Sequence, residues 1–247
     1  MMEAEFKDID LFKKIMDAVG ALMSDVSLDF DENGFSIKAM DPANIAMVLF
    51  EGKKNIFSSF VVDKSTKLSV SLDDLNSILR MIKKEDKIRL SDSKNKLSID
   101  IKGKNKMHFS IPLIDENYTA QKVPQLKFTA DFSALGSMVK DAIKAASLVD
   151  DSVYFTVDGQ RLIIGSRNEE KEFSEEVSMN ENKELFDIKS EGTTRAKYSI
   201  EYLIKILGIV DPDKPVKMSF SNNYPMKLDY EINPDANMSF ILANRIE

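Results

Sequence analysis

Residues 71–79 read Ser71-Leu72-Asp73-Asp74-Leu75-Asn76-Ser77-Ile78-Leu79, and 128 positions later residues 199–207 read Ser199-Ile200-Glu201-Tyr202-Leu203-Ile204-Lys205-Ile206-Leu207. In both stretches a serine precedes an apolar residue and an acid, the order that suits the N-cap and the positive end of a helix. Apolar residues then recur along each stretch. The two stretches therefore predict two copies of one helix, and they indicate an internal repeat.

Further similar segments occur in the same order in both halves of the chain. Each half opens with a strand that leads into an apolar-periodic helix, and an alternating hairpin follows. Each half closes with two more strand segments. The matched pairs are residues 6–22 with 128–146, residues 26–39 with 153–164, residues 88–91 with 216–219 and residues 107–111 with 238–242.

The repeat predicts an α+β fold dominated by antiparallel sheet, with two helices in each of two domains. Turn signals separate short strands rather than βαβ units. We expect an N-terminal domain over 1–114, an interdomain connector over 115–126 and a C-terminal domain over 127–247. The connector is polar, holds a proline and shows no clean period, as a linker should. The turn signals lie at residues 31–34, 52–55, 102–105 and 221–223.

The composition excludes several classes of protein. The 247 residues carry 34 Lys+Arg against 41 Asp+Glu, a formal net charge of −7, with one histidine and no cysteine. A hydrophobic content of 43% supports a globular core. Without cysteine there is no disulfide, thiolate metal site or cysteine nucleophile, which fits a reducing compartment. The apolar stretches fall far short of the roughly 20 residues that cross a bilayer, and the first residues lack a signal-peptide pattern. We expect no membrane association.

Basic residues follow the acids along the predicted helices. The acids lie mostly in the opening turns and the bases in later turns, as the helix dipole favours. Each base taken alone suits an ordinary solvated helix. Their joint occurrence in all four helices of a repeat instead favours one cationic surface that contacts phosphates without sequence preference. The candidate DNA-binding residues are Lys13, Lys14, Arg80, Lys83, Lys84, Lys140, Lys144 and Lys205.

Motifs for catalysis or metal binding are incomplete. Residues 29–34 begin like a calcium-binding loop, but the twelfth position is Met40 instead of Glu, so a hairpin turn is predicted. His108 is the one imidazole and is expected on a strand surface. The pairs Asp73-Asp74 and Asp150-Asp151 suit a helix start and a turn. We expect no catalytic residue, metal or cofactor. The alternative that stays open is a two-domain hydrolase using paired carboxylates.

Five stretches together resemble the DNA sliding clamp family, proliferating cell nuclear antigen. The Ala-Met-Asp-Pro motif at 39–42 and the Leu-Ala-x-Arg-Ile-Glu ending at 242–247 are specific to that family when they occur together. The resemblance covers essentially the whole chain, and the brief C-terminus is similar to that of archaeal members. The five stretches are residues 6–14, 37–48, 111–115, 224–226 and 240–247.

The resemblance implies a DNA clamp fold whose subunit closes head to tail with two others into a ring around duplex DNA. Such a ring serves DNA polymerase as a non-enzymatic processivity factor, and its helices line the bore. Weak phosphate contacts suit sliding, because topology rather than affinity holds the DNA. Lys13, Lys14 and Arg80 fall on family positions that face the bore.

Ring closure in the family pairs two edge strands, here expected over 106–113 and 171–178 of a neighbour. A homotrimer is expected. Two alternatives stay open, a subunit of a heterotrimeric ring and a monomer with a protected edge. The candidate interface residues are Met107, Phe109, Ile111, Phe173, Glu175 and Val177.

By the same resemblance, partner proteins dock a short motif of one aliphatic and two aromatic residues into a pocket beneath the connector. The expected partners are DNA polymerase, the clamp loader, a flap nuclease and ligase, in replication and repair. The expected location is the cytoplasm, at the nucleoid, or the nucleus for a eukaryotic source. The candidate pocket residues are Met40, Ile45, Tyr118, Val123, Pro225, Ile241 and Ala243.

Overall fold

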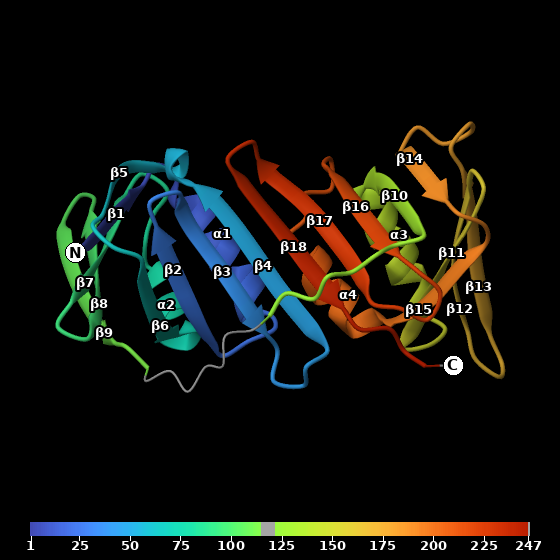
Figure 1. The fold of residues 1–247 in the computed structure, drawn as a ribbon, viewed down its shortest axis with the longest axis horizontal. Coiled ribbons are helices and arrows are strands. Elements are labelled where there is room, and N and C mark those ends of the chain that lie inside the picture. Colours follow the sequence, from blue (N-terminus) through green and yellow to red (C-terminus); the bar gives the residue numbers. More distant parts are fainter. Residues whose placement is uncertain (115–121, 247) are drawn as a thin grey trace. The chain divides into compact units, whose positions relative to one another are not determined.

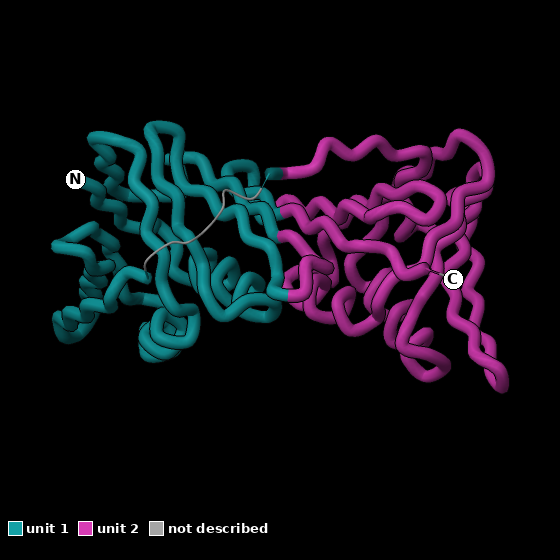
Figure 2. Tube along the Cα trace, turned by 60° about the horizontal axis from the view of Figure 1, so that its bottom comes forward, with its two compact units in different colours: residues 1–42, 48–122, 232–238 teal, residues 43–47, 123–231, 239–247 magenta. Residues whose placement is uncertain are grey.

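The computed structural model describes residues 1–114 and 122–246 (Figure 1). The chain divides into two compact units (Figure 2). Unit 1 comprises residues 1–42, 48–122 and 232–238, and unit 2 comprises residues 43–47, 123–231 and 239–247.

Unit 1 contains an antiparallel sheet with the strand order β5-β1-β7-β8-β9. It also contains a second set of hydrogen-bonded strands in the order β4-β3-β2-β6. Helices α1 and α2 pack against each other. A 3-10 turn, Lys54–Ile56, links β4 to β5. The elements are β1 Met2–Phe6, α1 Ile9–Gly20, β2 Asp25–Asp31, β3 Gly34–Met40, β4 Ala46–Lys53, β5 Phe57–Val62, β6 Thr66–Ser71, α2 Leu72–Leu79, β7 Lys87–Ser93, β8 Lys96–Lys102 and β9 Lys106–Pro112.

Unit 2 repeats this plan, with the strand orders β14-β10-β16-β17-β18 and β13-β12-β11-β15. Helices α3 and α4 pack against each other as α1 and α2 do. The predicted α+β repeat of two helices on antiparallel sheet is therefore confirmed. The elements are β10 Ala130–Leu135, α3 Gly136–Ala146, β11 Ser152–Asp158, β12 Arg161–Arg167, β13 Glu172–Ser178, β14 Leu185–Ser190, β15 Thr194–Ser199, α4 Ile200–Leu207, β16 Pro215–Phe220, β17 Met226–Asn233 and β18 Ala236–Leu242.

Aromatic side chains fill the core where each first helix meets its sheets. In unit 1 the rings of Phe6 and Phe12 stack with centroids 4.4 Å apart. In unit 2 Phe155 lies 6.0 Å from Phe132 and 6.4 Å from Phe220. All five side chains are buried, and burying a ring of this size stabilises a fold by roughly 2–3 kcal/mol. Helices α1 and α3 each add a set of buried apolar residues to these cores.

The turn between β2 and β3 requires a glycine. Asp31 accepts hydrogen bonds on Oδ1 from the backbone N–H groups of Asn33, at 2.7 Å, and Gly34, at 3.2 Å. Gly34 has φ +151°, and a Cβ there would lie 2.1 Å from the carbonyl oxygen of Gly52. The segment that begins like a calcium loop is therefore a hairpin turn, as predicted.

Three local predictions need correction. Ser71 caps α2 by accepting from the Asp74 N–H at 3.4 Å, but Ser199 at the equivalent position makes no side-chain cap bond to α4. The turn expected at 52–55 starts late, because β4 continues to Lys53. Helix α2 ends at Leu79, so Arg80 and the lysines after it lie outside the helix in which their charges were expected.

Candidate nucleic-acid, subunit and partner interfaces

The candidate DNA-binding residues of unit 1 lie in two places. Lys13 and Lys14 lie in the middle of α1, after Asp10 of its first turn, and both are half-buried. Lys13 donates a hydrogen bond from Nζ to the carbonyl oxygen of Ile82. Helix α1 is thereby tied to the chain that follows α2.

The other three cations of unit 1 are exposed and follow α2. Arg80 takes the C-cap position, and its N–H donates to the carbonyl of Asn76 at 3.0 Å. Lys83 and Lys84 lie in the loop beyond, and Lys84 Nζ is 3.7 Å from Asp10 Oδ2 of α1. These three cations lie at and beyond the C-terminal end of α2, where the negative end of the helix dipole attracts positive charge.

Unit 2 repeats the structural contact of Lys13. Lys140 on α3 donates from Nζ to the carbonyl oxygen of Val210 at 2.5 Å, and Val210 follows α4 as Ile82 follows α2. Lys144 and Lys205 do lie in the last turns of α3 and α4, as predicted. Lys144 is exposed, whereas Lys205 Nζ lies 2.7 Å from Glu201 Oε1.

The structure distinguishes two groups among six of these eight cations, and Lys14 and Lys205 are half-buried and belong to neither group. Lys13 and Lys140 each donate a hydrogen bond to a backbone carbonyl oxygen, so their ammonium groups also stabilise the fold. The group with exposed side chains consists of Arg80, Lys83, Lys84 and Lys144.

A cavity of about 300 Å³ between α3 and α4 was missed by the sequence reasoning. Its apolar side chains include Ile204, which is 54% exposed although it continues an apolar run. The sequence did hold a signal for this exposure, because the residue that matches Ile204 in the first repeat is Asn76. A buried apolar position would not readily accept asparagine, since burying its amide without a hydrogen bond is costly. The cavity is lined by Lys140, Ile143, Lys144, Ile204, Leu207 and Gly208.

The two strands predicted to join subunits both lie at the edge of a sheet. β9 is last in the order β5-β1-β7-β8-β9 and pairs with β8, and β13 is last in the order β13-β12-β11-β15 and pairs with β12. On one face of β9, Met107 and Phe109 are half-buried and Ile111 is buried. On one face of β13, Phe173 and Glu175 are half-buried and Val177 is buried. His108 lies on the other face of β9, exposed as predicted, with Nδ1 2.8 Å from Asp100 Oδ1.

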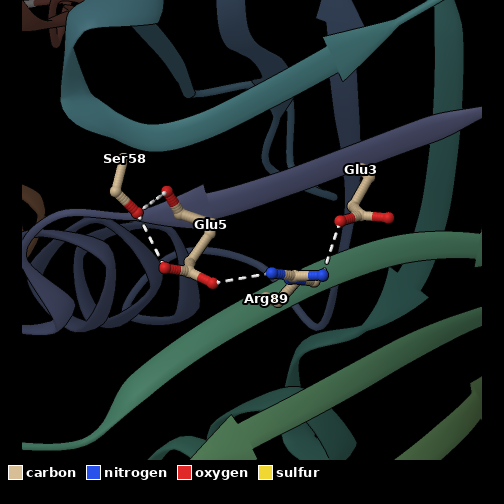
Figure 3. A network of polar contacts seen from close by, with 4 residues as sticks. All are labelled: Glu3, Glu5, Ser58 and Arg89. Carbon is tan, nitrogen blue, oxygen red and sulfur yellow. Dashed lines mark hydrogen bonds and ion pairs between the residues drawn. The ribbon is translucent and has the colours of Figure 1, made fainter.

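A polar network reinforces the sheet that ends in β9 (Figure 3). The guanidinium of Arg89 on β7 contacts Glu3 Oε1 at 2.7 Å and Glu5 Oε2 at 3.0 Å, both on β1. Ser58 on β5 donates to Glu5 Oε1 at 2.9 Å. The Ser58 hydrogen bond and then Arg89 hold the pKa of Glu5 below its usual value against the effect of burial. The network ties three neighbouring strands together.

The candidate partner-binding residues fall in different parts of the chain. Within unit 2, the N–H of Ala243 donates to the carbonyl of Ile45 at 2.8 Å, which brings these two residues together. Val123 is 41% exposed, whereas Ile241 is only 8% exposed and contributes little surface. Met40 belongs to unit 1. Tyr118 lies outside the described residues.

Polar contacts hold the segments around Pro225 and the C-terminal residues. Tyr198 donates from its hydroxyl to the carbonyl of Tyr224 at 2.8 Å, directly before Pro225, and burial raises the pKa of Tyr198 strongly. Arg245 contacts Asp151 Oδ1 at 2.7 Å, and its N–H donates to Lys197. These contacts fix the backbone directly before Pro225 and directly after the candidate residues Ile241 and Ala243.

The paired carboxylates have local structural roles. Asp73 and Asp74 are exposed in the first turn of α2. Asp150 accepts from Ser152 Oγ at 2.7 Å, and that bond lowers its pKa. Over residues 1–114 and 122–246, no three acidic or histidine side chains are grouped to hold a metal ion. In the same ranges no helix is long and apolar enough to cross a membrane.

Comparison with known proteins places these features in one family. The family described as "Proliferating cell nuclear antigen, N-terminal domain" matches residues 1–118. The DNA polymerase sliding clamp of Pyrococcus furiosus is 32% identical over 249 residues, covering 99% of this chain and 98% of that protein.

Solved structures of similar fold agree with the sequence match. The clamp protein PCNA from Thermococcus kodakaraensis superposes with a TM-score of 0.93 at 23% identity, covering 99% and 100% of the two chains. The A. fulgidus PCNA, solved with the C-terminal region of FEN-1 bound, gives 0.90 at 25% identity, covering 100% and 99%.

Proposed function

The chain belongs to the family of DNA polymerase sliding clamps, and from this premise we propose that three copies close into a ring that encircles duplex DNA. The ring would hold DNA polymerase at its template as a processivity factor. The main support for the proposal is the repeated unit, whose open edge strands β9 and β13 end two different sheets. A head-to-tail contact between different edges leads to a closed ring when the rotation between copies permits it.

DNA contact is proposed for the helical side of both units. The exposed cations Arg80, Lys83, Lys84 and Lys144 support it, because phosphates attract such side chains without reading sequence. Lys14 on α1 and Lys205 on α4 add charge on the other helix of each pair. The chain as a whole carries a net charge of −7, which repels DNA, so these cations would supply the local attraction that binding needs.

Ring closure is proposed through main-chain pairing of β9 with β13 of the next copy. Open strand edges carry unpaired N–H and C=O groups that invite aggregation unless they are covered. Pairing would cover both edges at once. Candidates at the joint are Met107, Phe109, Ile111, Phe173, Glu175 and Val177, which occupy the half-buried to buried faces of these strands.

Partner tethering is proposed for the surface around Ile45 and Ala243. The A. fulgidus relative binds the C-terminal region of FEN-1, which makes a flap nuclease tail a fitting ligand class for this chain. Polymerase, clamp loader and ligase would use the same surface through a similar short motif. Met40, Val123 and Pro225 are further proposed contacts, and so is Tyr118.

The proposal includes no catalytic step. Asp73 and Asp74 occupy the first turn of a helix, and Asp150 and Asp151 contact Ser152 and Arg245, which supports a structural role over a hydrolase. Substituting Asp73 or Asp74 with Asn would then reduce helix stability modestly, by about 0.5–1 kcal/mol each, without removing an activity.

Retention on circular DNA tests the proposal. The chain is loaded onto a nicked plasmid by a clamp loader with ATP, freed of unbound protein by gel filtration, and treated with a restriction enzyme that cuts once. We expect the protein to co-elute with the circle and to leave the DNA after linearisation. Equal retention on circular and linear DNA would show ordinary binding and would contradict encirclement.

A further inference from the structure

The cavity between α3 and α4 lies wholly within unit 2, and its walls combine apolar and cationic side chains. Ile143 and Leu207 line it and are buried, whereas Ile204 is 54% exposed. Lys140 and Lys144 add two positive charges, and among the described residues that line the cavity none is acidic. The cavity therefore offers an apolar surface next to positive charge.

The first repeat carries different residues at the matched positions. Lys13 and Lys140 are equivalent, because each bonds a carbonyl just after the second helix of its pair. A Cβ at Gly20 of α1 would lie 2.9 Å from Asn76 Nδ2, so this amide packs closely against α1. The helix pair thus accepts polar residues here, and the fold alone does not require the apolar and cationic lining of unit 2. The equivalents in unit 1 are Asp17 for Lys144, Asn76 for Ile204 and Arg80 for Gly208.

Gly208 at the end of α4 leaves the cavity open. Its φ of −53° and ψ of −36° suit residues other than glycine, so the backbone does not require glycine at this position. A Cβ there would have its nearest atoms, at 3.1 to 4.0 Å, in Ile204 and Lys205 of α4 itself. A side chain could therefore stand at residue 208, as Arg80 does at the matched position, and its absence keeps the space beside α4 free.

The lining selects for a ligand that is both apolar and negatively charged. An inorganic anion would satisfy the lysines but would leave the exposed part of Ile204 in water. An uncharged apolar molecule would cover Ile204 but would draw water away from the neighbouring ammonium groups without a compensating contact. A molecule with an apolar body and one carboxylate covers the isoleucine and forms charge-assisted hydrogen bonds with a lysine.

The size of the cavity favours a small molecule over a protein segment. A volume of about 300 Å³ lies at the lower end of the range for small-ligand pockets. The lining residues span one helical turn of α3, over 140–144, and one of α4, over 204–208. An amphipathic partner helix would instead need anchor sites spread over about two turns.

We propose that the cavity between α3 and α4 binds a small organic anion, a carboxylate with a medium-length aliphatic chain or one ring. Its apolar body lies against Ile204, and its carboxylate accepts hydrogen bonds from Lys144. Lys140 contributes positive charge while it donates to the carbonyl of Val210. Lys144 is also among the cations proposed to contact DNA, so a bound anion competes with a phosphate for the same ammonium group.

Methyl-resolved NMR on the full chain tests the site, with octanoate as the probe. The δ1-methyl groups of isoleucine are labelled, and those of Ile143 and Ile204 report on the cavity directly. We expect both signals to shift saturably with octanoate. Hexanoate, which is two methylenes shorter, should bind about fifteenfold more weakly, because each buried methylene adds to the affinity. Acetate lacks the apolar body and octylammonium lacks the negative charge, so neither should give saturable shifts.

Two variants carry the residues of unit 1 into unit 2. Ile204→Asn removes the exposed apolar side chain, and Lys144→Asp reverses the charge. Both new residues occur at the matched positions of the first repeat, and circular dichroism checks that each variant is folded. We expect each variant to weaken octanoate binding at least about tenfold, as read at the Ile143 methyl group that both retain.

Matched controls make the same substitutions at exposed positions of unit 2 outside the cavity. Phe186→Asn on β14 removes another exposed apolar side chain, and Lys183→Asp reverses another exposed lysine. We expect both controls to bind octanoate as the unmodified chain does. Equal losses in the control and cavity variants would place octanoate elsewhere and would overturn the proposal.

Three further outcomes would also overturn it. Octylammonium that binds as tightly as octanoate would show that the cavity does not select an anion. Acetate that binds as tightly as octanoate would show a site for a simple anion. Shifts of Ile143 and Ile204 with a short DNA duplex, but not with octanoate, would assign the cavity to DNA. Because the cavity lies within unit 2, each outcome can be read whether or not the chain forms a ring.

Discussion

The ammonium group of Lys140 on α3 donates a hydrogen bond of 2.5 Å to the carbonyl oxygen of Val210, just beyond the end of α4. Lys13 and Ile82 repeat the same relationship in the first half of the chain. A carbonyl after a helix end has no partner within the helix, and a lysine on the paired helix supplies one here. Lys13 therefore links α1 to the residues after α2, and Lys140 links α3 to the residues after α4, although both lysines were expected to contact DNA.

Removing that ammonium should destabilise the fold. We expect Lys140→Met to lower the free energy of unfolding by about 1–2 kcal/mol, because the apolar stem is kept while a charged hydrogen bond to Val210 is removed. Urea denaturation measures the change. Lys144→Met on the same helix is the matched control, since Lys144 is exposed, and we expect a change within about 0.5 kcal/mol. Equal losses in the two variants would argue against a structural role for Lys140.

DNA contact is better tested at the exposed cations than at Lys13 and Lys140. We expect Arg80→Glu/Lys144→Glu to weaken loading and polymerase stimulation while the ring keeps its mass. The slope of log affinity against log salt should fall by about one for each phosphate that the protein no longer neutralises.

The control for this variant carries the same change in charge away from the helices. Lys38→Glu/Lys64→Glu alters exposed lysines on β3 and in the loop after β5. We expect its polymerase stimulation to stay close to that of the unmodified protein. Equal losses in both variants would mean that net charge, rather than the helical surface, governs the effect.

Partner binding should depend on Ile45. We expect Ile45→Arg to reduce the affinity for a flap nuclease C-terminal peptide at least about tenfold, because a charge would have to be desolvated where the motif packs. Fluorescence anisotropy with a labelled peptide gives the affinity. Ile204→Arg is the matched control in the same unit, on the exposed side of α4, and should bind as the unmodified chain does. Unaltered affinity in Ile45→Arg would remove Ile45 from the proposed surface.

The network around Glu5 should make stability depend on pH. The pKa of Glu5 is lowered in the folded chain, so its contribution is present above the unfolded pKa and disappears as the pH falls through the folded pKa. We expect Glu5→Gln to destabilise the protein at pH 7 and to match the unmodified chain at low pH, where Glu5 is protonated in both states. Urea midpoints across that range measure the difference. A constant difference at every pH would show that charge on Glu5 is not what stabilises the network.

The repeat and the helix starts could be predicted from sequence because they depend on local patterns. Apolar spacing after Phe6 and Phe128 sets α1 and α3, and the Asn33-Gly34 and Asp158-Gly159 turns set the two hairpins. Composition and incomplete motifs argued against catalysis.

What could not be predicted depends on contacts between distant segments. The bond between Lys13 and Ile82 spans 69 positions, and nothing local to Lys13 distinguishes it from Lys14. The missing cap at Ser199 and the exposure of Ile204 likewise depend on how α4 packs rather than on its own sequence.

The solution mass of the purified chain, by light scattering over a concentration series, tests the ring most directly. We predict three times the chain mass of 27.9 kDa, held on dilution into the working range. A mass of one or two chains that persists at high concentration would contradict the homotrimer, and would mean that the ring needs other subunits or that this clamp fold has another use.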